Sequence, residues 1–205
     1  EVQQMAEKII YESAIKNKKD FGARNAALVA VDVKTGQILA MVGSYDYFDT
    51  ENDGNVNVTI MERQPGSAFK PFAYAAAFEK GFTPQTYVFD LPTEFSSYAN
   101  ICPPLNINFS AEKNSFCYHP QNYDEKFRGP VNLKQALAQS LNIPSVKTLY
   151  LAGIKETVEL AKKMGITSLK PYNEYGLSLV LGAAEVKPLD MASAYAIFPA
   201  DGTKT

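Results

Sequence analysis

The sequence predicts an α+β fold, because two adjacent strand-like segments near its start are followed by a buried, alanine-rich helix and several further helices. Its 205 residues are enough for one compact domain with a sizeable core. The net charge of -2 gives no support to nucleic-acid binding, which needs a concentrated basic surface.

The predicted strands occupy residues 26–33 and 37–42, which are rich in Val, Ile, Leu and Ala. Between them, the short segment Lys34-Thr35-Gly36 contains a glycine, which favours an antiparallel hairpin. A helix is predicted before the strands, at residues 2–17, because apolar residues recur there at helical spacing with Lys and Glu between them.

The strongest predicted helix covers residues 67–80. Proline and glycine at 65–66 break the chain before it, and Gly81 stands where a C-terminal glycine cap belongs. Its interior, residues 72–78, is apolar nearly all round, which is typical of a helix that is buried on most sides.

The region 82–130 is predicted to be dominated by loops, as a functional loop or a family-specific insertion, since it lacks strong periodicity over an unusual length. The proline in residues 141–144 is expected to break the chain between two later helices. The remaining helices are predicted at residues 133–140, 145–151, 155–164 and 188–198.

Two cysteines, Cys102 and Cys117, bracket part of this loop region. They are either unrelated thiols or a disulfide that closes a surface loop in an oxidising compartment, where it would contribute about 3 kcal/mol. Spacing alone does not decide between these alternatives. Two thiols and the single histidine, His119, do not make a structural zinc site.

The strongest chemical pattern is Ser-x-x-Lys, formed by Ser67 and Lys70. On a helix these side chains share one face, one turn apart. A serine hydroxyl becomes a good nucleophile when a nearby base takes its proton, and a lysine can be that base if burial lowers its pKa. Taken alone, the short pattern is more often a serine helix cap followed by a surface lysine.

A second pattern, Ser140-Leu141-Asn142, lies in a tight connection between two predicted helices. A second serine can relay a proton to a leaving amine, and an asparagine can hold a substrate amide. The alternative is that Ser140 and Asn142 are local helix caps.

Together the two patterns resemble the signature set of penicillin-binding proteins, in which Ser-x-x-Lys and Ser-x-Asn precede a Lys-Thr-Gly motif. The second pattern carries a leucine in its middle position. Longer segments resemble the transpeptidase domain of bifunctional, class A penicillin-binding proteins, namely residues 26–43, 63–84, 122–147 and 181–196.

This resemblance implies the fold that penicillin-binding proteins share with serine β-lactamases, an antiparallel sheet flanked by helices plus a helical subdomain. It implies a peptidoglycan D,D-transpeptidase or carboxypeptidase that works through an acyl-serine and is acylated by β-lactams. The protein would act at the extracytoplasmic face of the bacterial cell membrane, with a membrane anchor and a glycosyltransferase domain before residue 1.

The resemblance also implies a role for each motif residue. Ser67 would attack the carbonyl between two terminal D-alanines of a stem peptide, and Lys70 would be its general base. Ser140 would help to protonate the leaving D-alanine, and Asn142 would position the donor peptide. The partners are therefore peptidoglycan stem peptides and β-lactams, and no metal or organic cofactor is implied.

The third motif departs from the family pattern. Lys34-Thr35-Gly36 has the right letters but precedes the other two motifs, so it is interpreted as a hairpin turn. Residues 1–205 are therefore expected to be the N-terminal part of a single transpeptidase domain. Its C-terminal strands would be missing or supplied by a second chain, and the fragment would be inactive without them.

Two alternative functions remain. The fold also serves as a non-catalytic β-lactam sensor or cell-wall scaffold, because fold does not fix function. Residues 174–178 nearly match the Glu-x-x-Leu-Asn pattern with which class A β-lactamases hydrolyse their acyl-enzyme, but the final asparagine is replaced by Ser178. Steady turnover of a β-lactam would identify such a hydrolase.

Overall fold

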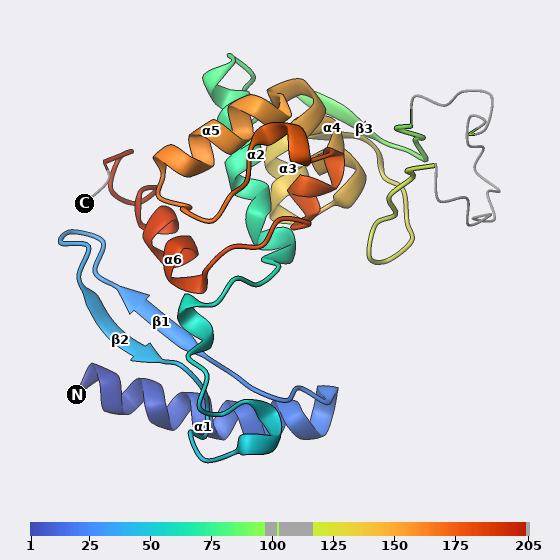
Figure 1. Ribbon diagram of the computed structural model, residues 1–205. Helices are drawn as coiled ribbons and strands as arrows, with labels where there is room; N and C mark the ends of the chain where they lie inside the picture. Colours follow the sequence, from blue (N-terminus) through green and yellow to red (C-terminus); the bar gives the residue numbers. More distant parts are fainter. Residues whose placement is uncertain (97–101, 103–116, 204–205) are drawn as a thin grey trace. The chain divides into compact units, whose positions relative to one another are not determined.

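A computed structural model describes residues 1–96, 102 and 117–203, and the chain divides into two compact units (Figure 1). Unit 1 comprises residues 1–65, 159–171 and 184–205, and unit 2 comprises residues 66–158 and 172–183. Both units combine helices with a two-stranded antiparallel sheet, which confirms the predicted α+β class.

Unit 1 contains the predicted hairpin, formed by β1 (Leu28–Val31) and β2 (Ile38–Val42), which are antiparallel. The N-terminal helix α1 (Val2–Phe21) lies along this hairpin (Figure 1). Small side chains let the helix approach the sheet closely, and burial of the apolar ones drives the packing. The core between them consists of Ala6, Ile10, Ala40 and Val42.

The connection between β1 and β2 is the predicted turn. Asp32 Oδ1 accepts hydrogen bonds from the backbone nitrogens of Lys34 and Thr35, both at 2.8 Å. Gly36 has a positive φ of 70°, which a glycine adopts without strain. The Lys-Thr-Gly segment therefore forms the turn of the hairpin. Strand β1 also contacts the last helix, α6 (Pro188–Ala196).

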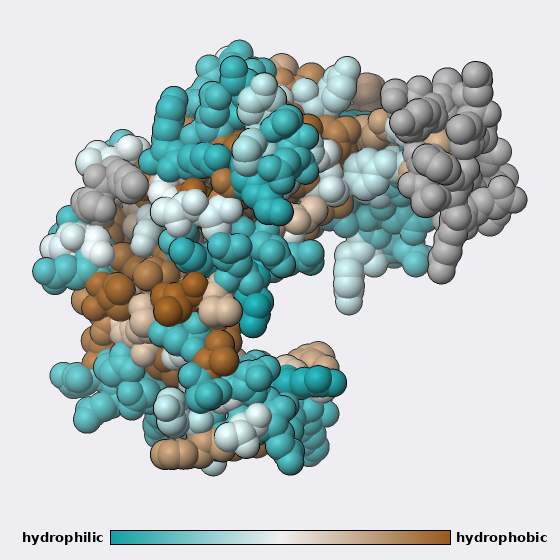
Figure 2. All heavy atoms as spheres, viewed as in Figure 1, coloured by the Kyte–Doolittle hydropathy of each residue, from teal (hydrophilic) through white to brown (hydrophobic). Residues whose placement is uncertain are grey.

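On the face drawn in Figure 2, apolar side chains are exposed over the hairpin of unit 1. Ile38 and Leu39 of β2 are about half exposed, at 48% and 47%. Single exposed apolar residues are ordinary, whereas a contiguous group on a sheet is typical of a surface that another element covers.

Unit 2 is organised around α2 (Lys70–Glu79) and α4 (Asn142–Ala152), which pack against each other (Figure 1). As predicted, α2 is buried on most sides. Its Phe72, Ala73 and Ala77 are at most 1% exposed. Because side chains that are this completely buried have little room to move, α2 is a rigid support for the residues of its first turn.

Two strands in the region 82–130 were not predicted. β3 (Tyr87–Asp90) and β4 (Gly129–Asn132) pair antiparallel and lead into α3 (Leu133–Ala138). Each has only four residues, and β3 ends on a buried aspartate where an apolar residue would complete the alternation. Such short segments carry too weak a pattern for a strand prediction.

The helix boundaries also differ from those predicted. Residues Gly66–Phe69 form a 3₁₀ turn before α2 rather than its first turn. The proline break at residues 141–144 is wrong, because α4 begins at Asn142 and includes Pro144 in its first turn. A proline is tolerated there, since the first amide hydrogens of a helix have no intrahelical acceptor. α5 (Ile154–Lys163) agrees with the prediction.

Cys102 and Cys117 are joined by a disulfide, with Cα atoms 5.4 Å apart. The intervening residues 103–116 lie outside the described residues. Among the helices that the structure describes, none has the length and apolar character required to cross a membrane.

Candidate active site

Ser67 lies in the 3₁₀ turn that leads into α2, and its side chain is exposed. Gly66 before it has a φ of 56°, in the left-handed region. The backbone of Gly182 approaches so closely that a Cβ atom there would lie 2.2 Å from the Gly66 nitrogen. Glycine is therefore required at 182, and this contact fixes the backbone turn that presents Ser67. No sequence motif indicated this role for Gly182.

Lys70 is the first residue of α2 and is only 1% exposed. Its Nζ donates hydrogen bonds to Ser140 O at 2.6 Å, to Ser140 Oγ at 3.0 Å and to Asn142 Oδ1 at 2.8 Å. The structure thus brings Lys70, Ser140 and Asn142 together from two predicted motifs that are 70 residues apart in sequence. Within the described residues, no hydrogen bond joins Lys70 to Ser67.

Burial lowers the pKa of Lys70 from its ordinary 10.5 to about 8. The surrounding atoms accommodate the amine in both protonation states. As an ammonium, it donates to all three oxygens. As a free amine, it donates to Ser140 O and Asn142 Oδ1 and accepts from the Ser140 hydroxyl, since a hydroxyl can donate or accept. Loss of the proton therefore leaves no broken hydrogen bond, and burial favours that loss.

Ser140 occupies a backbone position that usually belongs to glycine. Its φ is 53°, and its nitrogen donates to Leu137 O at 3.0 Å. The next nitrogen, of Leu141, donates to Ala136 O at 3.0 Å. These two bonds form a Schellman motif that ends α3, with serine at the left-handed residue. A non-glycine residue there is strained, and the hydroxyl that it carries contacts Lys70.

Replacing Ser140 with glycine is expected to stabilise the protein by about 1 kcal/mol, because glycine adopts the left-handed conformation without strain. The same change removes the hydroxyl from Lys70 and should slow chemistry that depends on it. Urea unfolding measures the change in stability, and covalent labelling of the active site measures the change in chemistry. Both measurements compare Ser140→Gly with Ser140→Ala. Lower stability in Ser140→Gly than in Ser140→Ala would contradict the strain argument.

Asn142 is the first residue of α4, and both ends of its amide are engaged. Oδ1 accepts from Lys70, and Nδ2 donates to Gln121 O at 2.8 Å. Its orientation is therefore set by a donor on one side and a carbonyl on the other. Sequence reasoning did not identify Gln121, which acts here through its backbone.

The other sequence candidates lie elsewhere in the chain. Lys34-Thr35-Gly36 is the hairpin turn of unit 1. Glu174 ends a 3₁₀ helix (Tyr172–Glu174) of unit 2 and is exposed. Glu94, which the sequence did not single out, lies within 4.8 Å of the sulfurs of Cys102 and Cys117, but disulfide sulfurs are not thiolates and do not form a metal site with it.

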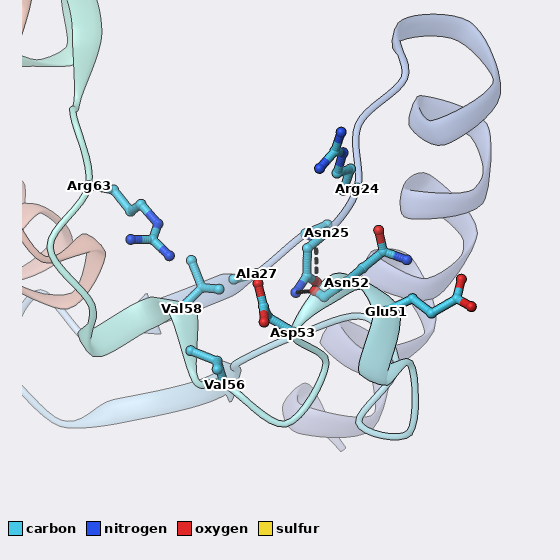
Figure 3. A pocket seen from close by; sticks show the side chains of 10 residues that line it. Arg24, Asn25, Ala27, Glu51, Asn52, Asp53, Val56, Val58 and Arg63 are labelled. Carbon is cyan, nitrogen blue, oxygen red and sulfur yellow. Dashed lines mark hydrogen bonds between the residues drawn. The ribbon is translucent and has the colours of Figure 1, made fainter.

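A separate cavity of about 330 Å³ lies in unit 1 (Figure 3). It is lined by charged side chains of both signs, including Arg24, Asp53 and Arg63, together with Val56 and Val58. It contains none of the predicted site residues, and its mixed charges favour no single class of ligand.

Comparison with known proteins identifies a family that matches most of this chain. The model of a family described as the penicillin binding protein transpeptidase domain matches residues 26–205. Penicillin-binding protein 1A from Aquifex aeolicus (strain VF5) is 38% identical over 178 residues, which cover 87% of this chain and 22% of that protein. The chain therefore spans about a fifth of the length of this curated relative.

Solved structures agree with the fold. Penicillin-binding protein 1A from Haemophilus influenzae has 33% identity and a TM-score of 0.67, covering 85% of this chain and 23% of its own. The PonA1 protein from Mycobacterium tuberculosis, solved in complex with penicillin V, has 23% identity and a TM-score of 0.67, covering 95% of this chain and 49% of its own.

Proposed function

The chain belongs to the penicillin-binding protein transpeptidase domain family, and we propose that it acts as a peptidoglycan D,D-transpeptidase with Ser67 as its nucleophile. The observation that carries this proposal is the environment of Lys70. A lysine that is 1% exposed, with a pKa lowered to about 8, lies three residues after an exposed serine and contacts Ser140 and Asn142. A surface lysine after a helix cap would share the spacing but would be exposed, so burial would not lower its pKa.

In the proposed reaction, Ser67 Oγ attacks the carbonyl carbon between the two terminal D-alanines of a stem peptide. Lys70 takes the hydroxyl proton as the new C–O bond forms. The backbone N–H of Ser67 supplies part of the oxyanion hole, where one donor is typically worth about 3 kcal/mol. The C–N bond then breaks, and D-alanine leaves with a proton that Lys70 returns through the Ser140 hydroxyl.

The second half of the reaction releases the acyl group. An amine of a neighbouring stem peptide attacks the ester, and the cross-link forms as Ser67 Oγ regains a proton. If water attacks instead, the outcome is carboxypeptidase activity. A β-lactam acylates the same serine by opening its ring, and its leaving nitrogen stays tethered, so the acyl-enzyme persists.

Membership of the family also suggests where the third motif, Lys-Thr-Gly, comes from and where the enzyme works. The Lys-Thr-Gly letters of this chain are used by a hairpin turn, and apolar residues of β2 are exposed. We therefore propose that further strands of the domain supply the third motif and cover the hairpin. The enzyme would work at the extracytoplasmic face of the cell membrane.

The test is an acyl-transfer assay with the complete polypeptide that carries residues 1–205. A synthetic stem peptide ending in D-Ala-D-Ala is supplied with an amine acceptor, and products are read by mass spectrometry. The proposal predicts release of D-alanine and a product that contains the acceptor. A β-lactam sensor would be labelled by penicillin but form no such product, and a β-lactamase would hydrolyse penicillin over many turnovers.

A further inference from the structure

Asn122 is buried, at 4% exposure, and uses both ends of its side-chain amide. Nδ2 donates to Asp90 Oδ1 at 2.8 Å and to Lys126 O at 2.8 Å. Oδ1 accepts from the backbone nitrogens of Asn142 at 2.8 Å and Ile143 at 3.4 Å. A buried amide with this many partners has one orientation, because a rotated amide would place its donors against the two N–H groups.

The contact with Asn142 and Ile143 is at the N-terminus of α4. The residue that precedes this helix is Leu141, whose side chain makes no capping hydrogen bond. The first amide hydrogens of a helix have no acceptor within the helix and need one from outside. Asn122, 20 residues earlier in the sequence, supplies the oxygen that a local Ser, Asp or Asn cap usually provides.

Asp90 anchors this arrangement. Its carboxylate is fully buried at the end of β3 and is held by Asn122 and by the backbone nitrogen of Arg128 at 3.1 Å. The Arg128 guanidinium lies 3.7 Å from the same carboxylate and compensates its charge. A buried carboxylate with these bonds is fixed in place, so the amide that it holds is fixed as well.

Residues 121–128 also contact both residues that flank the Ser140-Leu141 turn, Gln139 before it and Asn142 after it. Arg128 Nε donates to Gln139 Oε1 at 3.0 Å, directly before Ser140, while Gln121 O accepts from Asn142 Nδ2. Both neighbours of the turn that contacts Lys70 are therefore bonded to residues 121–128.

We propose that Asn122 is a positioning residue: anchored by Asp90, it holds the first turn of α4 so that Asn142 and Ser140 meet Lys70. The inference rests on the proposed function and deepens it. Asn122 touches no reacting atom and acts through Asn142, whose Oδ1 accepts from Lys70. A displacement of about 1 Å at such a contact can slow a reaction by about 100-fold.

The experiment compares Asn122→Ala with Asn132→Ala in the complete polypeptide. Asn132 is a matched control, because it also accepts from the N-terminus of a helix in unit 2, at Gln135 N of α3, and within the described residues it makes no hydrogen bond to Lys70. The rate constant for acylation by benzylpenicillin is measured from pH 6 to 10, and urea unfolding verifies that each variant is folded.

Asn122→Ala is expected to slow acylation by about 10- to 100-fold, whereas Asn132→Ala stays within about twofold of the wild type. The midpoint of the pH profile should also rise in Asn122→Ala, since a loosened turn admits water to Lys70 and relieves the burial that lowers its pKa. A purely structural role would reduce stability without moving this midpoint.

Asp90→Asn is the second variant, because it keeps the side-chain volume and so remains measurable if Asn122→Ala does not fold. Like Asn122→Ala, it should slow acylation and raise the midpoint of the pH profile, but both effects should be smaller. Wild-type rates and midpoints in the folded variants would overturn the inference while the proposed function stands. A wild-type protein that benzylpenicillin does not acylate would overturn the proposed function, and this inference with it.

Discussion

Replacing Ser67 with alanine is expected to abolish covalent labelling of the complete polypeptide by penicillin. The exposed hydroxyl in the turn before α2 is the atom that the acyl group would join, and alanine has no oxygen to form the ester. The substitution leaves the contact between Gly66 and Gly182 intact, so the fold should not change. Intact-protein mass spectrometry reads the result as one adduct in the wild type and none in the variant.

Ser140→Ala is the matched control for this result. It also removes a serine hydroxyl near Lys70, but Ser140 is proposed to move a proton and not to be acylated. Its adduct should therefore form more slowly and still lie on Ser67 after proteolysis. An adduct that survives in Ser67→Ala and disappears in Ser140→Ala would exchange the roles of the two serines.

Replacing Lys70 with methionine is expected to lower the rate of acylation by about 100- to 10,000-fold, the usual contribution of a general base. Methionine retains much of the length of the side chain in a site that is 1% exposed, but it accepts no proton from Ser67. Stopped-flow or quenched labelling with penicillin measures the rate. A loss of less than about tenfold would show that another group activates the serine.

Two further variants sharpen this prediction. Lys147→Met removes another lysine of unit 2 whose pKa is lowered by burial and should leave acylation nearly unchanged, since its Nζ bonds to Phe89 O. Lys70→Arg keeps a positive charge that cannot be given up near neutral pH. If Lys70 acts only as a fixed charge, Lys70→Arg retains activity, whereas a base mechanism requires that it lose nearly as much as Lys70→Met.

The motif residues could be predicted because the residues of each motif lie within three positions of each other in the sequence. Ser67 and Lys70 lie one turn apart, as the sequence indicates, and the Ser140 and Asn142 pattern lies where α3 gives way to α4, although Asn142 already belongs to α4. Their roles remain predictions, but the structure places Lys70 against both residues of the second pattern.

The supporting residues could not be predicted because each depends on a partner far along the chain. Asn122 is one of several asparagines in a polar region, and only the fold brings it to the start of α4. Asp90 ends a four-residue strand, and its buried carboxylate is held by Asn122 and Arg128, which lie more than 30 residues further along the chain. Gly182 matters because the backbone of Gly66 lies against it. Such contacts follow from tertiary structure and leave no local pattern.

The pH dependence of acylation tests most directly the central claim that burial prepares Lys70 as the base for Ser67. With a pKa of about 8, roughly a tenth of the lysine is a free amine at pH 7, whereas an ordinary lysine would be almost entirely protonated. The rate should therefore rise about tenfold per pH unit below 8 and level off above it. A rate that is independent of pH between 6 and 9, or that still rises steeply above pH 9, would contradict this claim.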